Sequence, residues 1–246
     1  MNKIIDNVRG FINRNIGYDI VHFDGQHNLR SHLSKVISTY KIKKIIDVGA
    51  NEGQFGIFLR SIGFKGDIFS FEPVAAPFKI LSSVSFFDHK WSVYNLALGA
   101  SSRESIINVS KHTSFSSLLT PSDYALGRWS NSHVDHQEKI TIKTLDELYA
   151  EGIIPIAADA LLKMDTQGFD LEVFKGSQTI MHHLCAILSE LSLIAVYDGM
   201  PNYMQSLSVF EAAGFSVSGF YPITRNKSLS LNEVDCVLVN TAKFGI

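Results

Sequence analysis

Short apolar runs alternate with amphipathic segments along most of this chain. The apolar runs predict strands, which we place at 44–48, 67–71, 92–97, 159–164, 185–190, 214–220 and 234–240. The amphipathic segments predict helices at 53–62, 74–82, 144–150, 170–182 and 202–213. Strands that alternate with helices build parallel sheets, so the pattern indicates a mostly parallel seven-stranded α/β sheet with helices on both faces.

The C-terminal end of the pattern differs, because no helix separates the last two apolar runs. Only residues 221–233 lie between them, and Pro222 and Asn226 are turn residues. We therefore predict a C-terminal hairpin, in which one strand runs antiparallel to the rest of the sheet.

Residues 99–143 interrupt the alternation of strands and helices. Residues 105–109 and 139–143 alternate as half-buried strands do, and a serine-rich stretch with Trp129 lies between them. A long loop inside a compact domain is usually functional or disordered, so we expect an inserted flap here. Its aromatic side chains could stack on a sugar ring or pack together as a small core.

Residues 1–40 precede the sheet and place apolar side chains at helical spacing, which predicts two helices in an N-terminal extension. Such an apolar stripe usually covers the core of a domain. It could also contact a membrane surface or a partner subunit, so a homo-oligomer formed through these helices is one expectation. The remaining residues 41–246 are expected to form the main domain with its flap.

The composition is that of an ordinary globular domain of 246 residues. The formal net charge is −2, so no overall field attracts nucleic acid. The two cysteines show no zinc-ligand spacing, and no apolar run is long enough to span a membrane. The N-terminus lacks the continuous apolar block of a signal peptide, so we expect a cytoplasmic protein.

A tight turn follows the first predicted strand, in the sequence Asp47-Val48-Gly49-Ala50-Asn51-Glu52-Gly53. Glycine and asparagine tolerate the positive φ angles that such a turn requires. The dinucleotide fingerprint G-x-G-x-x-G does not fit, and Asp47 and Glu52 would repel a pyrophosphate at the start of the following helix. A cationic sulfonium and an α-amino group suit these carboxylates better.

Two further carboxylates follow predicted strands. Glu72 comes after the second strand and can accept hydrogen bonds from both hydroxyls of a ribose. Asp165 ends the fourth long strand, beside the first turn, where ligands gather outside the sheet. Together these positions predict a nucleoside with a positive charge, which favours S-adenosylmethionine as the cofactor.

Several segments together resemble the FkbM family of methyltransferases over roughly residues 44–240. The similarity covers the first turn and four further motifs in the same order: Phe71-Glu72-Pro73, Asn95-Leu96-Ala97-Leu98-Gly99, Thr144-Leu145-Asp146-Glu147-Leu148 and Lys163-Met164-Asp165-Thr166-Gln167-Gly168-Phe169-Asp170. The family often has Glu or Asp where this chain has Gln167, so a metal ligand or base at that position would be lost here.

The resemblance implies a Rossmann-like class I methyltransferase fold and O-methylation of macrolide or sugar hydroxyls, with S-adenosylmethionine as donor. By resemblance, residues of the first turn hold the methionine end of the cofactor, Glu72 holds the ribose, and Pro73 also belongs to the cofactor site. Asn95 and Ala97 would border the adenine. The residues of the first turn are Asp47, Gly49, Ala50, Asn51 and Gly53.

Two routes to an activated hydroxyl are open from the sequence. Asp165 could accept the proton as a general base, or His133 or His136 of the flap could take that part. Alternatively, Asp165 and Glu190, at neighbouring strand ends, could bind Mg²⁺, which would acidify the hydroxyl.

Two other classes of function compete with a small-molecule or glycan O-methyltransferase. One is a non-catalytic protein that binds the cofactor or a partner through the same fold. The other is a nucleic-acid methyltransferase, which the absence of a [DNS]-P-P-[YF] motif and of a basic stripe disfavours.

Overall fold

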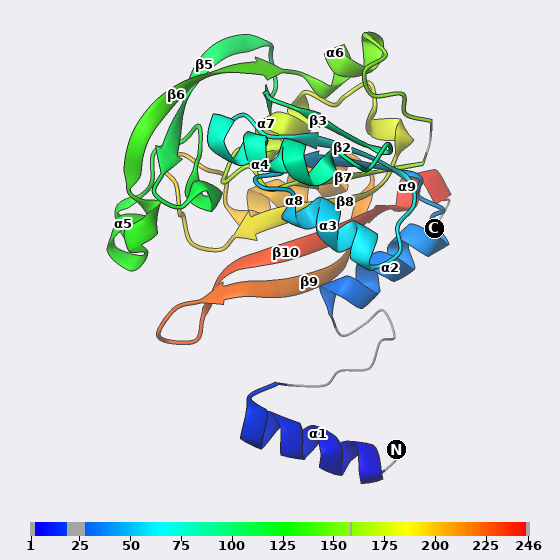
Figure 1. Cartoon of the computed structure of the whole chain (residues 1–246), viewed down its shortest axis with the longest axis vertical. Coiled ribbons are helices and arrows are strands. Elements are labelled where there is room, and N and C mark those ends of the chain that lie inside the picture. The colour runs from blue at the N-terminus through cyan, green and yellow to red at the C-terminus, as the bar shows by residue number, and fades with distance from the viewer. Residues whose placement is uncertain (1–2, 19–27, 158, 245–246) are drawn as a thin grey trace.

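The computed structural model describes residues 3–18, 28–157 and 159–244 (Figure 1). The helices, including three short 3-10 helices, are α1 (Lys3–Ile16), α2 (Leu29–Thr39), α3 (Gln54–Ser61), α4 (Ala75–Ser85), η1 (Thr113–Phe115), α5 (Asp123–Arg128), η2 (Ser130–Ser132), α6 (Leu145–Ala150), α7 (Asp170–Lys175), η3 (Met181–His183), α8 (Tyr203–Ala212) and α9 (Thr241–Phe244). The strands are β1 (Lys44–Val48), β2 (Asp67–Phe71), β3 (Trp91–Tyr94), β4 (Ala97–Leu98), β5 (Arg103–Ser110), β6 (Val134–Lys143), β7 (Ala160–Met164), β8 (Leu184–Ser192), β9 (Phe215–Arg225) and β10 (Leu231–Asn240).

The main sheet has seven strands in the order β3-β2-β1-β7-β8-β10-β9. The first five run parallel, and β10 pairs antiparallel with both β8 and β9. This confirms the predicted mostly parallel sheet with its C-terminal hairpin. The chain order reverses between β1 and β7, so the turns that follow these strands lie side by side at one edge of the sheet.

Helices cover both faces of the sheet, because successive strand residues point to opposite sides. In β1, Ile45 belongs to a core cluster with Leu33 of α2 and Leu59 of α3. Its neighbour Ile46 belongs to the opposite cluster, which contains Phe174 of α7. The parallel strands are therefore mostly apolar, and the polar side chains of the site lie near their carboxyl ends.

Helix α2 packs on this core through Leu33 and Val36, which are 0% and 4% exposed. Its start is fixed by the Asn28 side chain, which accepts a hydrogen bond from the Ser31 amide at 2.8 Å. We predicted an N-terminal extension over residues 1–40. We now propose that the main domain begins at α2 and that only α1 forms the extension.

Helix α7 is shorter than the predicted 170–182, because it ends at Lys175. Gly176 closes it, and a Cβ at this position would lie 2.1 Å from the carbonyl oxygen of Gly99. The end of the helix therefore packs directly against another backbone segment, and the chain continues through a turn into η3.

The flap contains a second sheet of three strands in the order β4-β6-β5. In Figure 1 its long strands β5 and β6 arch away from one end of the main sheet. Ile107 and Val109 of β5 and Ile140 and Ile142 of β6 form a small core with Val74. The predicted strands at 105–109 and 139–143 lie within β5 and β6 and pair antiparallel.

Helix α1 carries an exposed apolar face. Ile5, Val8, Phe11 and Ile16 are 60%, 50%, 60% and 59% exposed. Within the described residues, no helix combines the length and the apolar composition that crossing a bilayer requires.

Candidate active site

The turn after β1 brings two backbone segments into contact. Gly49, Asn51 and Gly53 have φ angles of +74°, +46° and +92°, in the region that favours glycine and asparagine. A Cβ at Gly49 would lie 2.0 Å from the carbonyl oxygen of Asp165. Only glycine therefore allows the first turn to lie against the turn after β7.

Glu72 connects the end of β2 to this turn. Its carboxylate accepts hydrogen bonds from the amides of Asn51, at 2.8 Å, and Val74, at 2.9 Å. The residue is 6% exposed, and burial raises the pKa of its carboxyl to about 7 despite these two hydrogen bonds. Each oxygen keeps a lone pair for a further donor.

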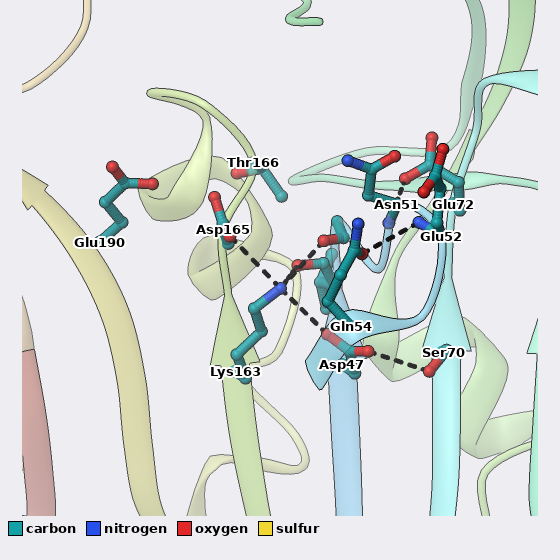
Figure 2. Close-up of polar contacts among 12 residues, drawn as sticks. Asp47, Asn51, Glu52, Gln54, Ser70, Glu72, Lys163, Asp165, Thr166 and Glu190 are labelled. Atoms are coloured by element: carbon teal, nitrogen blue, oxygen red, sulfur yellow. Dashed lines mark hydrogen bonds and ion pairs between the residues drawn. The ribbon is translucent and has the colours of Figure 1, made fainter. Parts of the chain in front are cut away.

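Asp47 and Lys163 form a buried ion pair beneath the turn, as Figure 2 shows. The Lys163 ammonium lies 3.0 Å from Oδ1 of Asp47 and donates to the carbonyl oxygen of Gly49 at 2.9 Å. Asp47 is 0% exposed, and Ser70 donates to its Oδ2 at 3.0 Å. The carboxylate of Asp47 therefore supports the turn from below, whereas we had predicted that it contacts the cofactor.

Asp165 lies at the carboxyl end of β7 with its side chain 40% exposed. Desolvation opposes its ionisation, but the Lys163 ammonium, 3.6 Å from its Oδ2, and side-chain hydrogen bonding with Glu190 and Gln167 hold the pKa of this carboxyl below its usual value. Burial opposes the charged form of Lys163 as well, but Asp47 and Asp165 raise the pKa of its ammonium. Asp165 is thus an anion whose side chain is partly exposed at the edge of the sheet.

Glu190, on the adjacent strand β8, joins Asp165 through Gln167. The Gln167 amide nitrogen donates to Oδ1 of Asp165 at 2.9 Å and to Oε2 of Glu190 at 3.1 Å. Burial, together with the neighbouring Asp165 and Glu233, raises the pKa of Glu190 well above its usual value. Burial likewise raises the pKa of Glu233, and burial and Asp165 raise the pKa of Asp235 to about 6. Four carboxyl groups therefore gather on this side of the site.

A segment of the flap, residues 113–118, crosses over the site, and we call it the strap. Thr113 donates its hydroxyl to the Asn51 side chain at 3.0 Å, and Ser117 donates to the Gln167 carbonyl oxygen at 2.7 Å. The buried Tyr197 hydroxyl lies 3.0 Å from the Phe115 carbonyl oxygen. The strap is therefore held to both turns and to the loop after β8.

Three pockets meet at Gly49 and Asp165, which line all of them. The nucleoside pocket, as we call the first, is a narrow cavity of about 50 Å³ between the ends of β1 and β2 and the strap. It is lined by residues that include Glu72, Pro73, Val74, Ala97, Leu118 and Phe169.

The second and third pockets adjoin each other beside the first turn, because both are lined by Gly49, Asn51, Ser114, Asp165 and Asp235. The second, which we call the acceptor pocket, has about 400 Å³ and is lined by residues that include Ser114, Phe115, Gln167, Glu190, Glu233 and Asp235. The third has about 370 Å³ and is lined by residues that include Ala50, Asn51, Phe55, Phe58 and Lys163. Among the described residues that line the three pockets, Lys163 is the only lysine or arginine, so the site is predominantly acidic.

Several residues predicted from the sequence lie outside these pockets. Asn95 donates to the carbonyl oxygens of Glu72 and Pro73, at 2.9 and 3.0 Å, and so holds the backbone that borders the nucleoside pocket. Gly53 starts α3, and a Cβ there would lie 3.0 Å from the Leu81 side chain.

The flap histidines lie outside the three pockets, whereas the flap aromatic residues pack together. His133 is exposed and His136 lies between Asp135 and Glu138, and neither histidine lines any of the three pockets described above. Trp129 contacts both Phe115 and Tyr124, with ring centroids 5.9 Å apart in each pair. The aromatic side chains thus form the small core that was one of our two alternatives.

The candidate Mg²⁺ site fits the observed arrangement poorly. Donor hydrogens of Gln167 face the carboxylates of Asp165 and Glu190 at the place where a cation would bind. In the described part of the chain, no group of three or more His, Cys, Asp or Glu residues is arranged to hold a metal ion.

Some residues of the site were missed in the sequence. A lysine inside a strand of otherwise apolar residues was the available signal for Lys163, because a buried charge needs a partner. Tyr197, Glu233 and Asp235 come from the loop after β8 and from the hairpin, and no local pattern marks them as neighbours of Asp165.

Comparison with known proteins gave a family match and similar structures. A family model described as the methyltransferase FkbM domain matches residues 47–217. No curated protein sequence matches the chain.

Similar solved structures include three methyltransferases. A candidate O-methyltransferase from Klebsiella pneumoniae is 11% identical, with a TM-score of 0.48, over 98% of this chain and 91% of that chain. A candidate RNA methyltransferase from Pyrococcus horikoshii is 14% identical, with a TM-score of 0.42, over 87% and 83%. Precorrin-6y C5,15-methyltransferase from Geobacter metallireducens is 12% identical, with a TM-score of 0.44, over 86% of each chain.

Proposed function

The chain belongs to the FkbM family of methyltransferases, and from this premise we propose that it transfers a methyl group from S-adenosylmethionine to a hydroxyl of a sugar or another hydroxyl-bearing small molecule. The observation that carries the proposal is the place of Asp165. This carboxylate lines both the nucleoside pocket and the acceptor pocket. A proton acceptor is needed at such a junction, because an alcohol must lose its proton when it is methylated.

The residues around the first turn fit the proposed cofactor. Glu72 would accept the ribose hydroxyls, and Pro73 and Ala97 would border the adenine in the same pocket. Gly49, Ala50 and Asn51 would hold the methionine end in the pocket beyond the turn. Asp47 and Gly53 would act indirectly, by fixing the turn. The acidic surroundings support this assignment, because S-adenosylmethionine carries positive charges at its sulfonium and α-amino groups.

The acceptor pocket suits a polyhydroxylated molecule better than an anion. Glu190, Glu233 and Asp235 offer oxygen atoms that can accept hydrogen bonds from sugar hydroxyls. The ionised Asp165, together with Asp235 above about pH 6, would repel a phosphate or a carboxylate on the acceptor. Its volume of about 400 Å³ lies in the range of pockets that bind small molecules.

The chemical roles of the chain's own residues follow from this arrangement. When bound, S-adenosylmethionine supplies an already activated methyl group. Asp165 would take the proton of the acceptor hydroxyl as that oxygen becomes methylated. Lys163 would keep Asp165 ionised and ready to accept it. The strap would exclude water from the two pockets that it covers.

A methyl-transfer assay tests the proposal and its acceptor class. The protein would be incubated with methyl-labelled S-adenosylmethionine and matched pairs of neutral and phosphorylated saccharides. We expect labelled O-methyl products from neutral members and little or none from their phosphorylated partners. Transfer to the anionic members alone would contradict the acceptor class. No transfer and no heat on titration with S-adenosylhomocysteine would favour the non-catalytic alternative.

The raised pKa of Glu72 predicts that binding of the nucleoside depends on pH. The ionised carboxylate accepts from both ribose hydroxyls, whereas the protonated form has one acceptor fewer. With a pKa of about 7, the ionised fraction rises about tenfold between pH 6 and pH 8, so affinity should rise with pH by up to about that factor. Calorimetry with adenosine, which has no group that titrates in this range, measures the effect.

The variant Glu72→Gln is the control for this pH dependence, because its side chain does not titrate. Its adenosine affinity should be weaker and flat between pH 6 and pH 8. Asp235 also titrates near this range, but it lines the other two pockets and should not change the result. A pH profile that is the same in the wild type and in Glu72→Gln would remove Glu72 from the ribose site.

A further inference from the structure

Gln167 occupies a strained position at the centre of the site. Its φ angle is +54°, a left-handed conformation that residues other than glycine and asparagine rarely adopt. The turn after β7 therefore directs this side chain back across the end of the sheet, toward β8. Such strain persists only where surrounding contacts hold the residue in place.

Every polar group of the Gln167 side chain has a partner of matching chemistry. The amide nitrogen donates to the carboxylates of Asp165 and Glu190, one hydrogen to each. The amide oxygen lies 2.8 Å from the Tyr197 hydroxyl, which donates to it. The opposite orientation of the amide would place its oxygen between two carboxylates, so the network itself fixes how the amide points.

A hydrogen-bond donor between the carboxyl groups of Asp165 and Glu190 stabilises their arrangement. Asp165 and Glu190 lie at the ends of adjacent parallel strands, and the charge of Asp165 helps to raise the pKa of Glu190, so a second negative charge here is unfavourable. A donor group that bridges them relieves this repulsion and fixes the direction of each carboxylate. Gln167 provides such a bridge without adding charge, where a third carboxylate would need a cation.

The same residue is connected to the strap at two points. Ser117 donates to the Gln167 carbonyl oxygen at 2.7 Å. The single hydroxyl hydrogen of Tyr197 is shared between the Gln167 amide oxygen and the Phe115 carbonyl oxygen, which lie 2.8 and 3.0 Å from the hydroxyl. Tyr197 is 2% exposed, so these contacts are protected from competition with water. Movement of the strap therefore changes the contacts that hold Gln167.

We propose that Gln167 is a positioning residue that bridges Asp165 and Glu190 and, through Tyr197 and Ser117, couples the direction of the Asp165 carboxylate to closure of the strap. The role of Asp165 as proton acceptor rests on the proposed function. The bridge and its coupling to the strap do not, and they can be tested separately.

The variant Gln167→Glu tests the bridge. It places a third carboxylate beside Asp165 and Glu190, so the protein should lose thermal stability and regain a large part of it when Mg²⁺ or Mn²⁺ is added. The wild type and the matched control Gln178→Glu, an exposed glutamine on the loop after α7, should show no such response. If Gln167→Glu responds to the metal no more than the control does, the bridging role is overturned.

The variant Tyr197→Phe tests the coupling, because it keeps the buried ring and removes only the hydroxyl. Amide hydrogen exchange in residues 113–118 should become faster, while exchange in β7 and β8 stays at the wild-type rate. Unchanged exchange in the strap would show that Tyr197 does not hold it, and would overturn the coupling. This readout does not depend on the enzyme's reaction.

Steady-state kinetics then distinguish positioning from a merely structural role. In Tyr197→Phe and Gln167→Ala, kcat should fall on the order of 10- to 100-fold while the KM for S-adenosylmethionine changes little, because a small misplacement of a reacting group affects turnover more than cofactor binding. A fall in stability with kcat unchanged would contradict the proposal. If the wild type transfers no methyl group at all, the proposed function fails, while the metal and exchange results still decide the bridge.

Discussion

Replacing Asp165 with asparagine is expected to reduce methyl transfer by about 10²- to 10⁴-fold, the range for loss of a general acid or base. Asparagine has nearly the same shape and can still accept a hydrogen bond from Gln167, but it cannot take the proton of the acceptor. Because Glu72 and the first turn are untouched, affinity for S-adenosylhomocysteine should stay close to that of the wild type. Single-turnover kinetics and calorimetry measure the two quantities.

The matched control for this experiment is Glu172→Gln. Glu172 lies on α7, close to the same turn, and its side chain is 37% exposed outside the three pockets. The substitution removes one negative charge from the same region and should leave transfer unchanged. Wild-type turnover in Asp165→Asn would end the catalytic assignment of Asp165, whatever the cofactor affinity.

Replacing Lys163 with methionine is expected to lower the free energy of unfolding by about 3–5 kcal/mol, the range for breaking a buried ion pair by removing one partner. Asp47 is 0% exposed and would keep only the hydrogen bond from Ser70. The carbonyl oxygen of Gly49 would lose its donor as well. Urea denaturation followed by circular dichroism measures the change.

Two comparisons make the Lys163 result specific. Lys175→Met removes an exposed ion pair with Glu172 and should cost less than about 1 kcal/mol. The double variant Lys163→Met/Asp47→Asn should recover a substantial part of the lost stability, because no unpaired charge then remains buried. If Lys163→Met is as stable as Lys175→Met, the ion pair does not hold the turn in place.

The sheet was predictable because its signal is local and repeated. The apolar runs at 44–48 and 67–71 coincide with β1 and β2, since parallel strands covered on both faces are mostly apolar. The final hairpin followed from the absence of a helix between two strands. The C-terminal end of α7 was missed, because the contact between Gly176 and Gly99 that ends it joins segments far apart in the sequence.

Half of the candidate site could be predicted from the sequence, because its residues follow strands that have a local and repeated signal. Glu72 and Asp165 follow strands directly, and the strand order places such residues at one edge of the sheet. We predicted that the Asp47 side chain faces the cofactor, but it is buried beneath the turn. A carboxylate at a strand end can point into the core or outward, and the direction depends here on the position of Lys163. The partners Tyr197 and Glu233 depend on how a loop and the hairpin fold over that edge.

The strap has a consequence for the order of events in a catalytic cycle. Thr113 of the strap donates a hydrogen bond to Asn51 of the first turn. The strap also lines both the nucleoside pocket and the acceptor pocket. The nucleoside pocket has a volume of only about 50 Å³ with the strap in this position, which is too small for a nucleoside. The strap therefore has to move away before a nucleoside can enter or leave. We therefore expect an ordered reaction, in which the donor binds before the acceptor and the spent donor leaves last. Release of the spent donor would then be the rate-limiting step of turnover.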